Sequence, residues 1–358
     1  MKMEEFKAET KTHEKENQSA FGMYREASGA SEKETQTLRN VFSAIPPGLS
    51  AIETAHEMRR KLITQGFQYN DRLFRLQDIL KKKGGNCLGL SLLIGAELLE
   101  RGFQPSFRLI TRPKDAIAKK EQELFDRLTT GGVLDYDKPK LPEHQADHPI
   151  YRFVPLSHPA LILDGVTFET TGLDDVEENP EWTPEAEETI EVSFQELTGT
   201  VYSESARQTK KTTRIGIEKA IELEKKSLII WPGNLDALLY LWECAKAIGD
   251  EKTAEDAASE YMKSMSKASS ALWGKYCISN DPVFLNRALE QYPSYLYPFI
   301  EKHVTLEPDM REARFHFAVA AWCIGNSSVI SLIDFYTTHR SDLERLFGAE
   351  EAERLIKG

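Results

Sequence analysis

Several features are missing from this chain of 358 residues, and each absence narrows what the protein can be. No run reaches the roughly 18 consecutive apolar residues that a membrane span requires. The first residues, MKMEEFKAETKTHEKENQS, lack the apolar centre of a secretory signal. We therefore expect a cytoplasmic protein with no membrane partner.

Cysteine is scarce, and its spacing fits neither a disulfide framework nor a zinc site. The four cysteines are Cys87, Cys244, Cys277 and Cys323, and no two of them form a CxxC pair. In a chain of this size without a secretory signal, the four cysteines are better interpreted as reduced thiols than as disulfides. Because zinc-finger spacing is absent as well, we expect no metal and no cofactor.

Basic residues are absent from one long window. Phe153 to Ala206 spans 54 residues without Lys or Arg, and 13 of these residues are acidic. The whole chain has 45 basic and 57 acidic residues, a formal net charge of −12, so the remainder is nearly balanced. Binding to nucleic-acid phosphates depends on clustered Lys and Arg. We therefore expect no nucleic-acid partner.

The chain is long enough for two domains, and its first part is expected to mix helices with a sheet. Residues 1–40 are polar and predict a disordered or frayed arm. Residues 41–172 are expected to form one domain, of the α+β class. Within it, Ser50 and Glu53 form a capping-box pattern that predicts a helix over Ser50–Gln65. A second helix is expected over Arg72–Lys82.

The segment from Asn86 to Leu99 is apolar nearly all round, which predicts a central, buried helix. A strand is expected at Ser106–Thr111, followed by an insertion or lid at 112–150. The three further expected strands are Tyr151–Leu156, Ala160–Leu163 and Val166–Thr170. Asp164-Gly165, between the last two, is a strong signal for a two-residue hairpin.

The remainder is expected to be an acidic linker, 173–196, and a helical domain, 197–358. Pro232 is followed by Ala, Ala, Ile and Gly at offsets of 5, 13, 16 and 17 residues, and the same residues follow Pro308 at the same offsets. This pattern resembles tetratricopeptide repeats, which are stacked helical hairpins. The resemblance implies a domain that recruits a protein or peptide.

Cys87 is the residue best placed for chemistry. It follows Gly84-Gly85-Asn86 and opens the buried helix. A thiol at a helix N-terminus lies at the positive end of the helix dipole, beside backbone N–H groups without partners. Both features favour the thiolate and offer donors to an oxyanion. A cysteine of this kind is also commonly a small core residue, which is our interpretation of the other three.

The surroundings of Cys87 resemble the transglutaminase-like superfamily, which shares the papain-like cysteine-enzyme core. The carrying motifs are Phe67-Gln68-Tyr69, the helix that runs into Gly85-x-Cys87, and the long apolar helix that ends near Gly102. The matched region covers about 48–111 and 151–172. The resemblance implies a buried, Cys-bearing helix packed on an antiparallel sheet that carries a His and then an acid.

Ser157-His158-Pro159 matches the family's His strand, and Val166–Thr171 matches its acid strand, with Glu169 where Asp is usual. The resemblance thus assigns a triad of Cys87, His158 and Glu169. His158 would pair with the thiolate and Glu169 would orient the imidazole ring. Pro159 confines this segment to a strand start or a sheet edge.

Several alternatives stay open at the sequence level. His148 is a second candidate for the base, Asp164 is a second candidate for the acid, and either Gln68 or Tyr69 could complete the oxyanion site. His144 and His148 lie on a Pro-rich loop and are poor evidence for a metal.

Two functions follow. The first is a cysteine enzyme that hydrolyses or transfers amide substrates through a Cys87 thioester, with repeats that recruit the substrate. The second is an inactive adaptor of the same architecture. The basic-free window predicts a site that favours cationic or neutral peptides, unless it is only a solvated linker. The residues alone do not indicate the oligomeric state.

Overall fold

The computed structural model describes residues 19–291 except 71, 112–156, 172, 174–180, 183–187 and 210–212, together with positions 340, 344, 349, 350 and 353. The chain divides into two compact units. Unit 1 contains Met1–Arg112 and Leu156–Ser264, and unit 2 contains Pro113–Pro155 and Met265–Gly358. The structure combines helices with an antiparallel sheet, as expected for the α+β class.

Unit 1 begins with two helices, α2 (Ala20–Ser28) and α3 (Glu32–Phe42). Phe21 and Tyr24 are fully buried in the main core, and the Tyr24 hydroxyl donates a 2.6 Å hydrogen bond to the Phe74 carbonyl. The expectation of a frayed arm over 1–40 is therefore wrong from residue 20 onward. A few large aromatic side chains dock a mostly polar segment, because each buries a large apolar surface. Residues 1–18 lie outside the described part.

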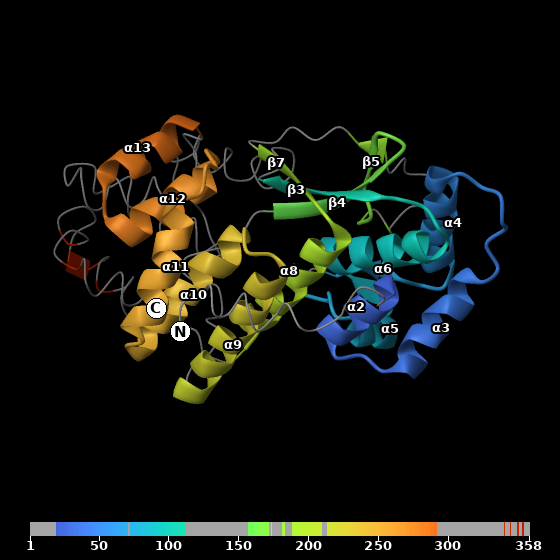
Figure 1. Ribbon diagram of the computed structural model, residues 1–358, viewed down its shortest axis with the longest axis horizontal. Coiled ribbons are helices and arrows are strands. Elements are labelled where there is room, and N and C mark those ends of the chain that lie inside the picture. Colours follow the sequence, from blue (N-terminus) through green and yellow to red (C-terminus); the bar gives the residue numbers. More distant parts are fainter. Residues whose placement is uncertain are drawn as a thin grey trace. The chain divides into compact units, whose positions relative to one another are not determined.

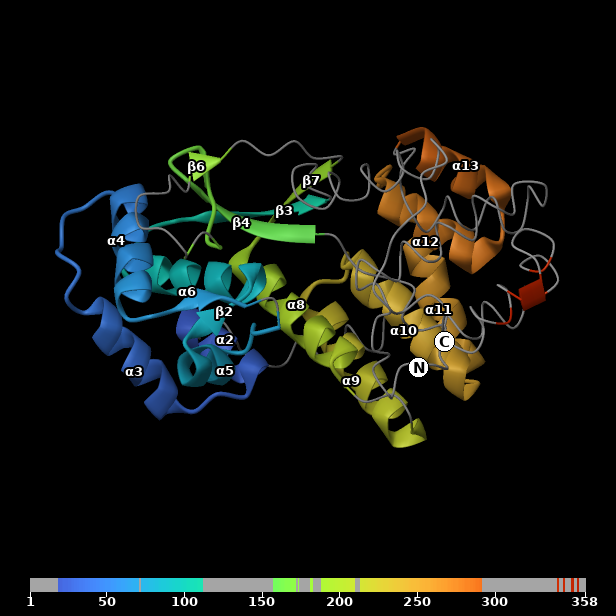
Figure 2. The same ribbon diagram turned by 180° about the vertical axis from the view of Figure 1, so that it is seen from behind.

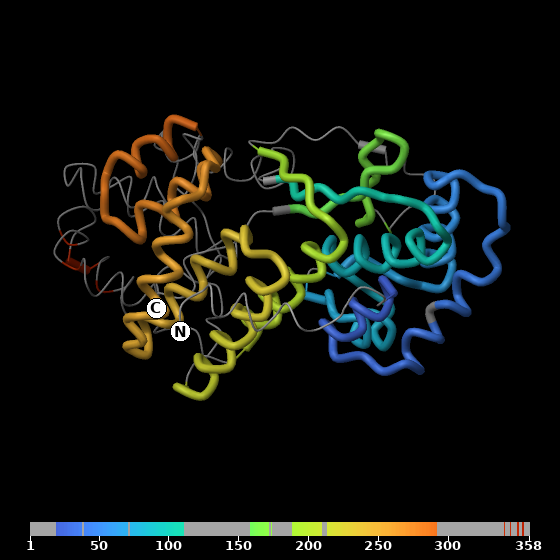
Figure 3. The backbone as a smooth tube through the Cα atoms, in the orientation of Figure 1, coloured from blue at the N-terminus to red at the C-terminus, as the bar shows by residue number. Residues whose placement is uncertain are grey.

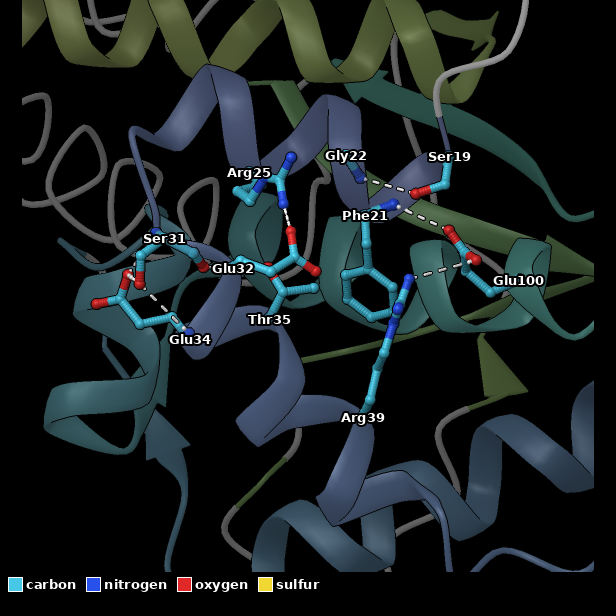
Figure 4. A network of polar contacts seen from close by, with 10 residues as sticks. All are labelled: Ser19, Phe21, Gly22, Arg25, Ser31, Glu32, Glu34, Thr35, Arg39 and Glu100. Carbon is cyan, nitrogen blue, oxygen red and sulfur yellow. Dashed lines mark hydrogen bonds and ion pairs between the residues drawn. The ribbon is translucent and has the colours of Figure 1, made fainter.

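Polar contacts attach these two helices to each other and to the end of the central helix (Figure 4). Glu100 accepts a hydrogen bond from the Phe21 backbone N–H at 3.4 Å and lies 3.6 Å from the Arg39 guanidinium. Arg25 forms an ion pair with Glu32 across the turn between the helices. The N-terminal helices are thus an integral part of the fold.

The next three helices were all expected from the sequence, two of them with nearly the observed bounds. They are α4 (Ala51–Thr64), α5 (Leu76–Lys82) and α6 (Cys87–Glu100). Ser50 and Glu53 form the expected capping box at the start of α4. Helix α5 begins four residues later than expected. The Leu73 carbonyl accepts from the Asn86 backbone N–H and the Phe74 carbonyl accepts from the Tyr24 hydroxyl, so neither carbonyl is used for a bond within the helix.

Helix α6 lies between the sheet and helices α2 and α5 in both ribbon views (Figures 1 and 2). Two glycines allow this close packing. A Cβ on Gly95 would lie 2.5 Å from the Phe107 ring, and a Cβ on Gly89 would lie 2.8 Å from the Cα atom of Phe74. The helix is buried along nearly its whole length, as its apolar sequence predicts.

The main sheet of unit 1 has five strands in the order β6-β5-β4-β3-β7, and every neighbouring pair is antiparallel. The strands are β3 (Ser106–Thr111), β4 (Ser157–Leu163), β5 (Val166–Phe168), β6 (Glu181–Trp182) and β7 (Glu188–Val192). Figure 3 shows β3 and β4 side by side, although a long stretch of chain separates them. The Asp164-Gly165 hairpin forms with positive φ at both residues. The expected strand Tyr151–Leu156 and the insertion 112–150 lie outside the described residues.

Part of the expected linker, 173–196, belongs to this sheet. Strand β7 pairs with β3 along its full length, and β6 pairs with β5. An acidic segment can form an outer strand because alternate side chains face solvent, and Thr189 and Glu191 do so here.

Pro159 lies inside β4 rather than at its first residue. Its Cα partner on β3 is Leu109, whereas pairing with β5 begins only at Leu161. One side of β4 therefore has no β5 ladder at Pro159, which explains why a residue without an N–H is tolerated there.

Four further helices complete unit 1. They are α8 (Phe194–Arg207), α9 (Arg214–Ile230), α10 (Leu235–Ile248) and α11 (Glu251–Met262), and each packs on the next in turn. Phe194, Leu197 and Val201 of α8 join the same core as α6. The boundary between the units thus falls after Ser264 and not within 173–196, because α8 is held to the sheet domain by apolar burial.

The first copy of the expected repeat corresponds to α10, in which Ala237 and Ala245 are fully buried and Gly249 ends the helix with φ 76°. The second copy, 308–325, lies outside the described residues.

In unit 2, the described elements are α12 (Ser269–Ser279) and α13 (Pro282–Gln291). They pack around Trp273, Tyr276 and Leu285. None of the helices described here is long and apolar enough to cross a bilayer.

Candidate active site

Cys87 is the first residue of α6 and is half-buried. Asn86 caps the helix, because its side-chain oxygen accepts from the Gly89 N–H at 2.9 Å. The Asn86 backbone N–H donates to the Leu73 carbonyl at 2.6 Å, which fixes the chain as it enters the helix. The sulfur therefore lies at a helix N-terminus, where unpaired N–H groups and the dipole stabilise negative charge.

The short strands before the helix hold this entry in place. Strand β1 (Gln68–Tyr69) pairs in parallel with β2 (Gly84–Gly85). A Cβ on Gly84 would lie 3.0 Å from the Gln68 carbonyl oxygen, so the two backbones are in close contact. The two candidate oxyanion donors, Gln68 and Tyr69, thus flank the segment that leads into Cys87, and Tyr69 is exposed.

His158 and Glu169 are joined directly. His158 Nε2 lies 2.6 Å from Glu169 Oε2, and each side chain is 20% exposed. His158 lies near the start of β4, and Glu169 directly follows β5. The β4–β5 hairpin pairs Leu161 with Phe168, which brings the flanking residues 158 and 169 close together.

Cys87 completes the group through His158. Burial lowers the pKa of His158, but hydrogen bonds and charge interactions with Cys87 and Glu169 outweigh it and raise the pKa to about 10. The imidazole is therefore held as a cation at neutral pH, between a thiol and a carboxylate. The three side chains are thus placed in the order Cys87, His158, Glu169, with the imidazole in the middle.

The Glu169 carboxylate is held in place by Thr171. The Thr171 backbone N–H and hydroxyl both donate to Glu169 Oε1, at 2.8 and 2.7 Å. Burial raises the pKa of Glu169, but the bond and charge of His158 and the donors of Thr171 reverse this and lower it. One carboxylate oxygen is thus anchored while the other faces the imidazole.

The sequence reasoning missed three hydroxyl groups at this site. Besides Thr171, these are Ser91 and Thr170, which are fully buried and 3.0 Å apart. The sequence does contain a signal for Ser91, because it is the only polar side chain between Cys87 and Glu97 in an otherwise apolar segment. A lone polar residue in a buried helix indicates a specific hydrogen-bond partner.

The alternative acid, Asp164, does not join the group. Asp164 lies in the exposed turn at the other end of β4 from His158. His144 and His148 fall outside the described residues, as does Cys323. Cys244 is buried in α10, and Cys277 is half-buried in α12.

No cluster of three or more His, Cys, Asp or Glu side chains able to hold a metal occurs in the part of the chain that the structure describes. Comparison of the chain with protein-family models, with curated proteins and with solved structures found no match.

Proposed function

We propose that this protein is a cysteine enzyme of the transglutaminase-like, papain-like type, which acts on amide or peptide bonds through a Cys87 thioester. The supporting observation is the contact of His158 with both Cys87 and Glu169. Three residues converge here in the order Cys, His, acid: one from a helix N-terminus, one from β4 and one from the residue that directly follows β5. The α+β arrangement of a Cys-bearing helix packed on an antiparallel sheet agrees with that proposal.

In the proposed resting state, Cys87 is a thiolate and its proton is on His158; in the first step, the thiolate sulfur attacks the carbonyl carbon of the amide and forms a tetrahedral oxyanion. The Cys87 backbone N–H donates to this oxyanion. His158 gives its proton to the amide nitrogen, the C–N bond breaks, and an amine leaves. The product is a thioester on Cys87 with a neutral imidazole beside it.

In the second step, water or an amine attacks the thioester carbonyl. His158 takes the proton of the attacking group, and the C–S bond breaks. Hydrolysis releases an acid, whereas an amine gives a new amide. Glu169 holds the ring orientation in both steps and stabilises the cation, without accepting the proton itself.

The helices from α8 onward are proposed to recruit the protein or peptide substrate, in the manner of tetratricopeptide repeats. In the described part, α8 to α11 pack consecutively, and the small residues of the first repeat copy are buried at helix contacts. The acidic window beside the site would favour cationic or neutral peptides over acidic ones.

Selective alkylation tests the catalytic proposal. Iodoacetamide at pH 6, followed by peptide mapping, should label Cys87 well before Cys277, which is also half-buried and serves as the matched control. An ordinary thiol, with a pKa of about 8.5, is roughly 0.3% ionised at this pH. His158→Ala should abolish the preference. Equal, slow labelling of both cysteines in the wild type would instead support the inactive adaptor.

The substrate can be sought with a Cys87→Ala variant, which retains the binding surface but forms no thioester. A partner captured by this variant should be cleaved or modified when it is mixed with the wild type. A captured partner that the wild type leaves unchanged would favour the adaptor.

A further inference from the structure

Ser91 connects the nucleophile helix to strand β4 and to the segment that directly follows β5. It lies four residues, about one turn, after Cys87 and therefore on the same face of α6. Its hydroxyl donates to the Pro159 carbonyl at 3.1 Å and lies 3.0 Å from the Thr170 hydroxyl. Ser91 and Thr170 are both completely buried.

The direction of these bonds follows from proton counting. A serine hydroxyl has one proton and accepts with its lone pairs. Because the Ser91 proton goes to the Pro159 carbonyl, the proton between the two hydroxyls belongs to Thr170. The chain of donors thus runs from Thr170 through Ser91 to Pro159.

Each contact of Ser91 lies next to a residue of the triad. Pro159 follows His158 directly, and Thr170 follows Glu169 directly. The serine therefore touches the two segments that carry the base and the acid, while its own helix carries the nucleophile.

The other polar contacts of α6 that are described above, through Glu100, reach the N-terminal helices and not the sheet. Toward β4, the helix otherwise packs through apolar groups, whose attraction is not directional. Buried hydrogen bonds are directional, and leaving one unmade costs about 1–3 kcal/mol. A displacement of about 1 Å at a reacting group can lower a rate roughly 100-fold. A polar contact at this point therefore carries positional information that the apolar packing lacks.

We propose that Ser91 and Thr170 form a hydroxyl clamp that sets the position of Cys87 relative to His158 and Glu169. Both are positioning residues that do not touch the substrate. This inference rests on the proposed function, since it assigns a role within the same site.

The test is the pH dependence of Cys87 alkylation in variants of both residues. Thr170→Val keeps the shape of the side chain and removes only its hydroxyl, whereas Thr170→Ser keeps the hydroxyl. Ser91→Ala removes both bonds. Thr198→Val is the matched control, because Thr198 is also a buried threonine whose hydroxyl forms a hydrogen bond. Its partner is the Phe194 carbonyl within α8.

We expect Thr170→Val and Ser91→Ala to lower the alkylation rate of Cys87 at pH 6 by roughly 10- to 100-fold. Their rates should rise toward alkaline pH as an ordinary thiol's does. Thr170→Ser should keep most of the wild-type rate and its pH profile, and Thr198→Val should keep the profile even if it lowers the melting temperature. Protection of the buried Cys244 from labelling reports that each variant is folded.

The possible failures are distinguishable. If the wild type shows the fast reaction at pH 6 and folded Thr170→Val keeps the same profile, the clamp is overturned while the proposed enzyme stands. Should Ser91→Ala prove too unstable to fold, Thr170→Val decides the question, because it leaves the bond from Ser91 to Pro159 in place. If the wild type itself shows no preference for Cys87, the proposed function fails and the clamp with it.

Discussion

Glu169 contacts His158 at Nε2, with the two atoms 2.6 Å apart. Because a histidine ring has only two nitrogens, this leaves Nδ1 as the nitrogen that faces the Cys87 thiol. The carboxylate therefore determines which edge of the ring serves the nucleophile. Glu169 is in turn held by two donors from Thr171, so the orientation of the imidazole depends on a short segment directly after β5.

His158 should remain protonated far above the usual pH for a histidine. Its pKa of about 10 lies above the ordinary value, so its contribution to stability is complete below about pH 6.5 and is lost as the pH rises through 10. A ¹⁵N-detected NMR titration of the ring checks this. Glu169→Gln and Cys87→Ala should each lower the pKa, and an unchanged value in both variants would contradict the pairing.

Thr171→Val should weaken the site without dismantling it. The substitution removes the hydroxyl donor to Glu169 Oε1 and keeps the backbone donor, so the carboxylate stays in place with more freedom. We expect a reduction in Cys87 alkylation at pH 6 of about tenfold, corresponding to roughly 1.4 kcal/mol. Thr171→Ser, which retains the hydroxyl, is the control. Rates that match the wild type in both variants would show that the side-chain donor is dispensable.

Tyr24→Phe should destabilise unit 1, because the N-terminal helices are part of its core. The variant removes the 2.6 Å bond to the Phe74 carbonyl in a fully buried setting. Loss of one buried partner costs about 1–3 kcal/mol, which urea denaturation can resolve. Unchanged stability would mean that the segment Ala20–Ser28 contributes little to the cooperative fold.

Gly89→Ala should be more damaging than an ordinary glycine replacement in a helix. Its Cβ would lie 2.5 Å from Ile79 and 2.8 Å from the Cα atom of Phe74, and backbone has little room to move. We expect a loss of about 1–3 kcal/mol. Gly199→Ala is the control, since its nearest neighbour is a side-chain atom of Ile230 at 3.3 Å. Equal melting temperatures for the two variants would contradict the close approach.

Glu224 should make unit 1 less stable at alkaline pH. It is completely buried in α9, where Ser203 donates to one oxygen at 3.0 Å. Among the described residues, the other oxygen has no hydrogen-bond partner. Burial raises the pKa of Glu224 to about 8. The positive charge of Arg207 lowers this pKa, whereas the negative charges of Glu204 and Asp236 raise it further.

The folded state therefore binds the Glu224 proton more tightly than the unfolded state does. Stability should fall as the pH rises from about 4.5 to 8 and should level off above that. Glu224→Gln, which is always neutral, should show a smaller fall when urea denaturation is compared at pH 5 and pH 9. An identical pH dependence in the two proteins would rule out this role for Glu224.

The features that the sequence predicted best depend on residues close together in the chain. The capping box of Ser50 and Glu53 and the Asp164-Gly165 hairpin both formed as expected, because their energies come from local hydrogen bonds and backbone preferences. The docking of Phe21 and Tyr24 and the pairing of β7 with β3 were not predicted. Both depend on partners many residues away, which local patterns do not reveal.

The sequence by itself determined the chemical types at the candidate site: a thiol at a helix start, a histidine on one strand and an acid on the next. Only the tertiary structure decided that Glu169 rather than Asp164 meets His158, and that Ser91 reaches both β4 and the segment after β5. The reason is that hydrogen bonds act over about 3 Å, whereas helix and strand patterns place a side chain only to within a face. Packing of α6 against the β4–β5 hairpin reduces that uncertainty to a single arrangement.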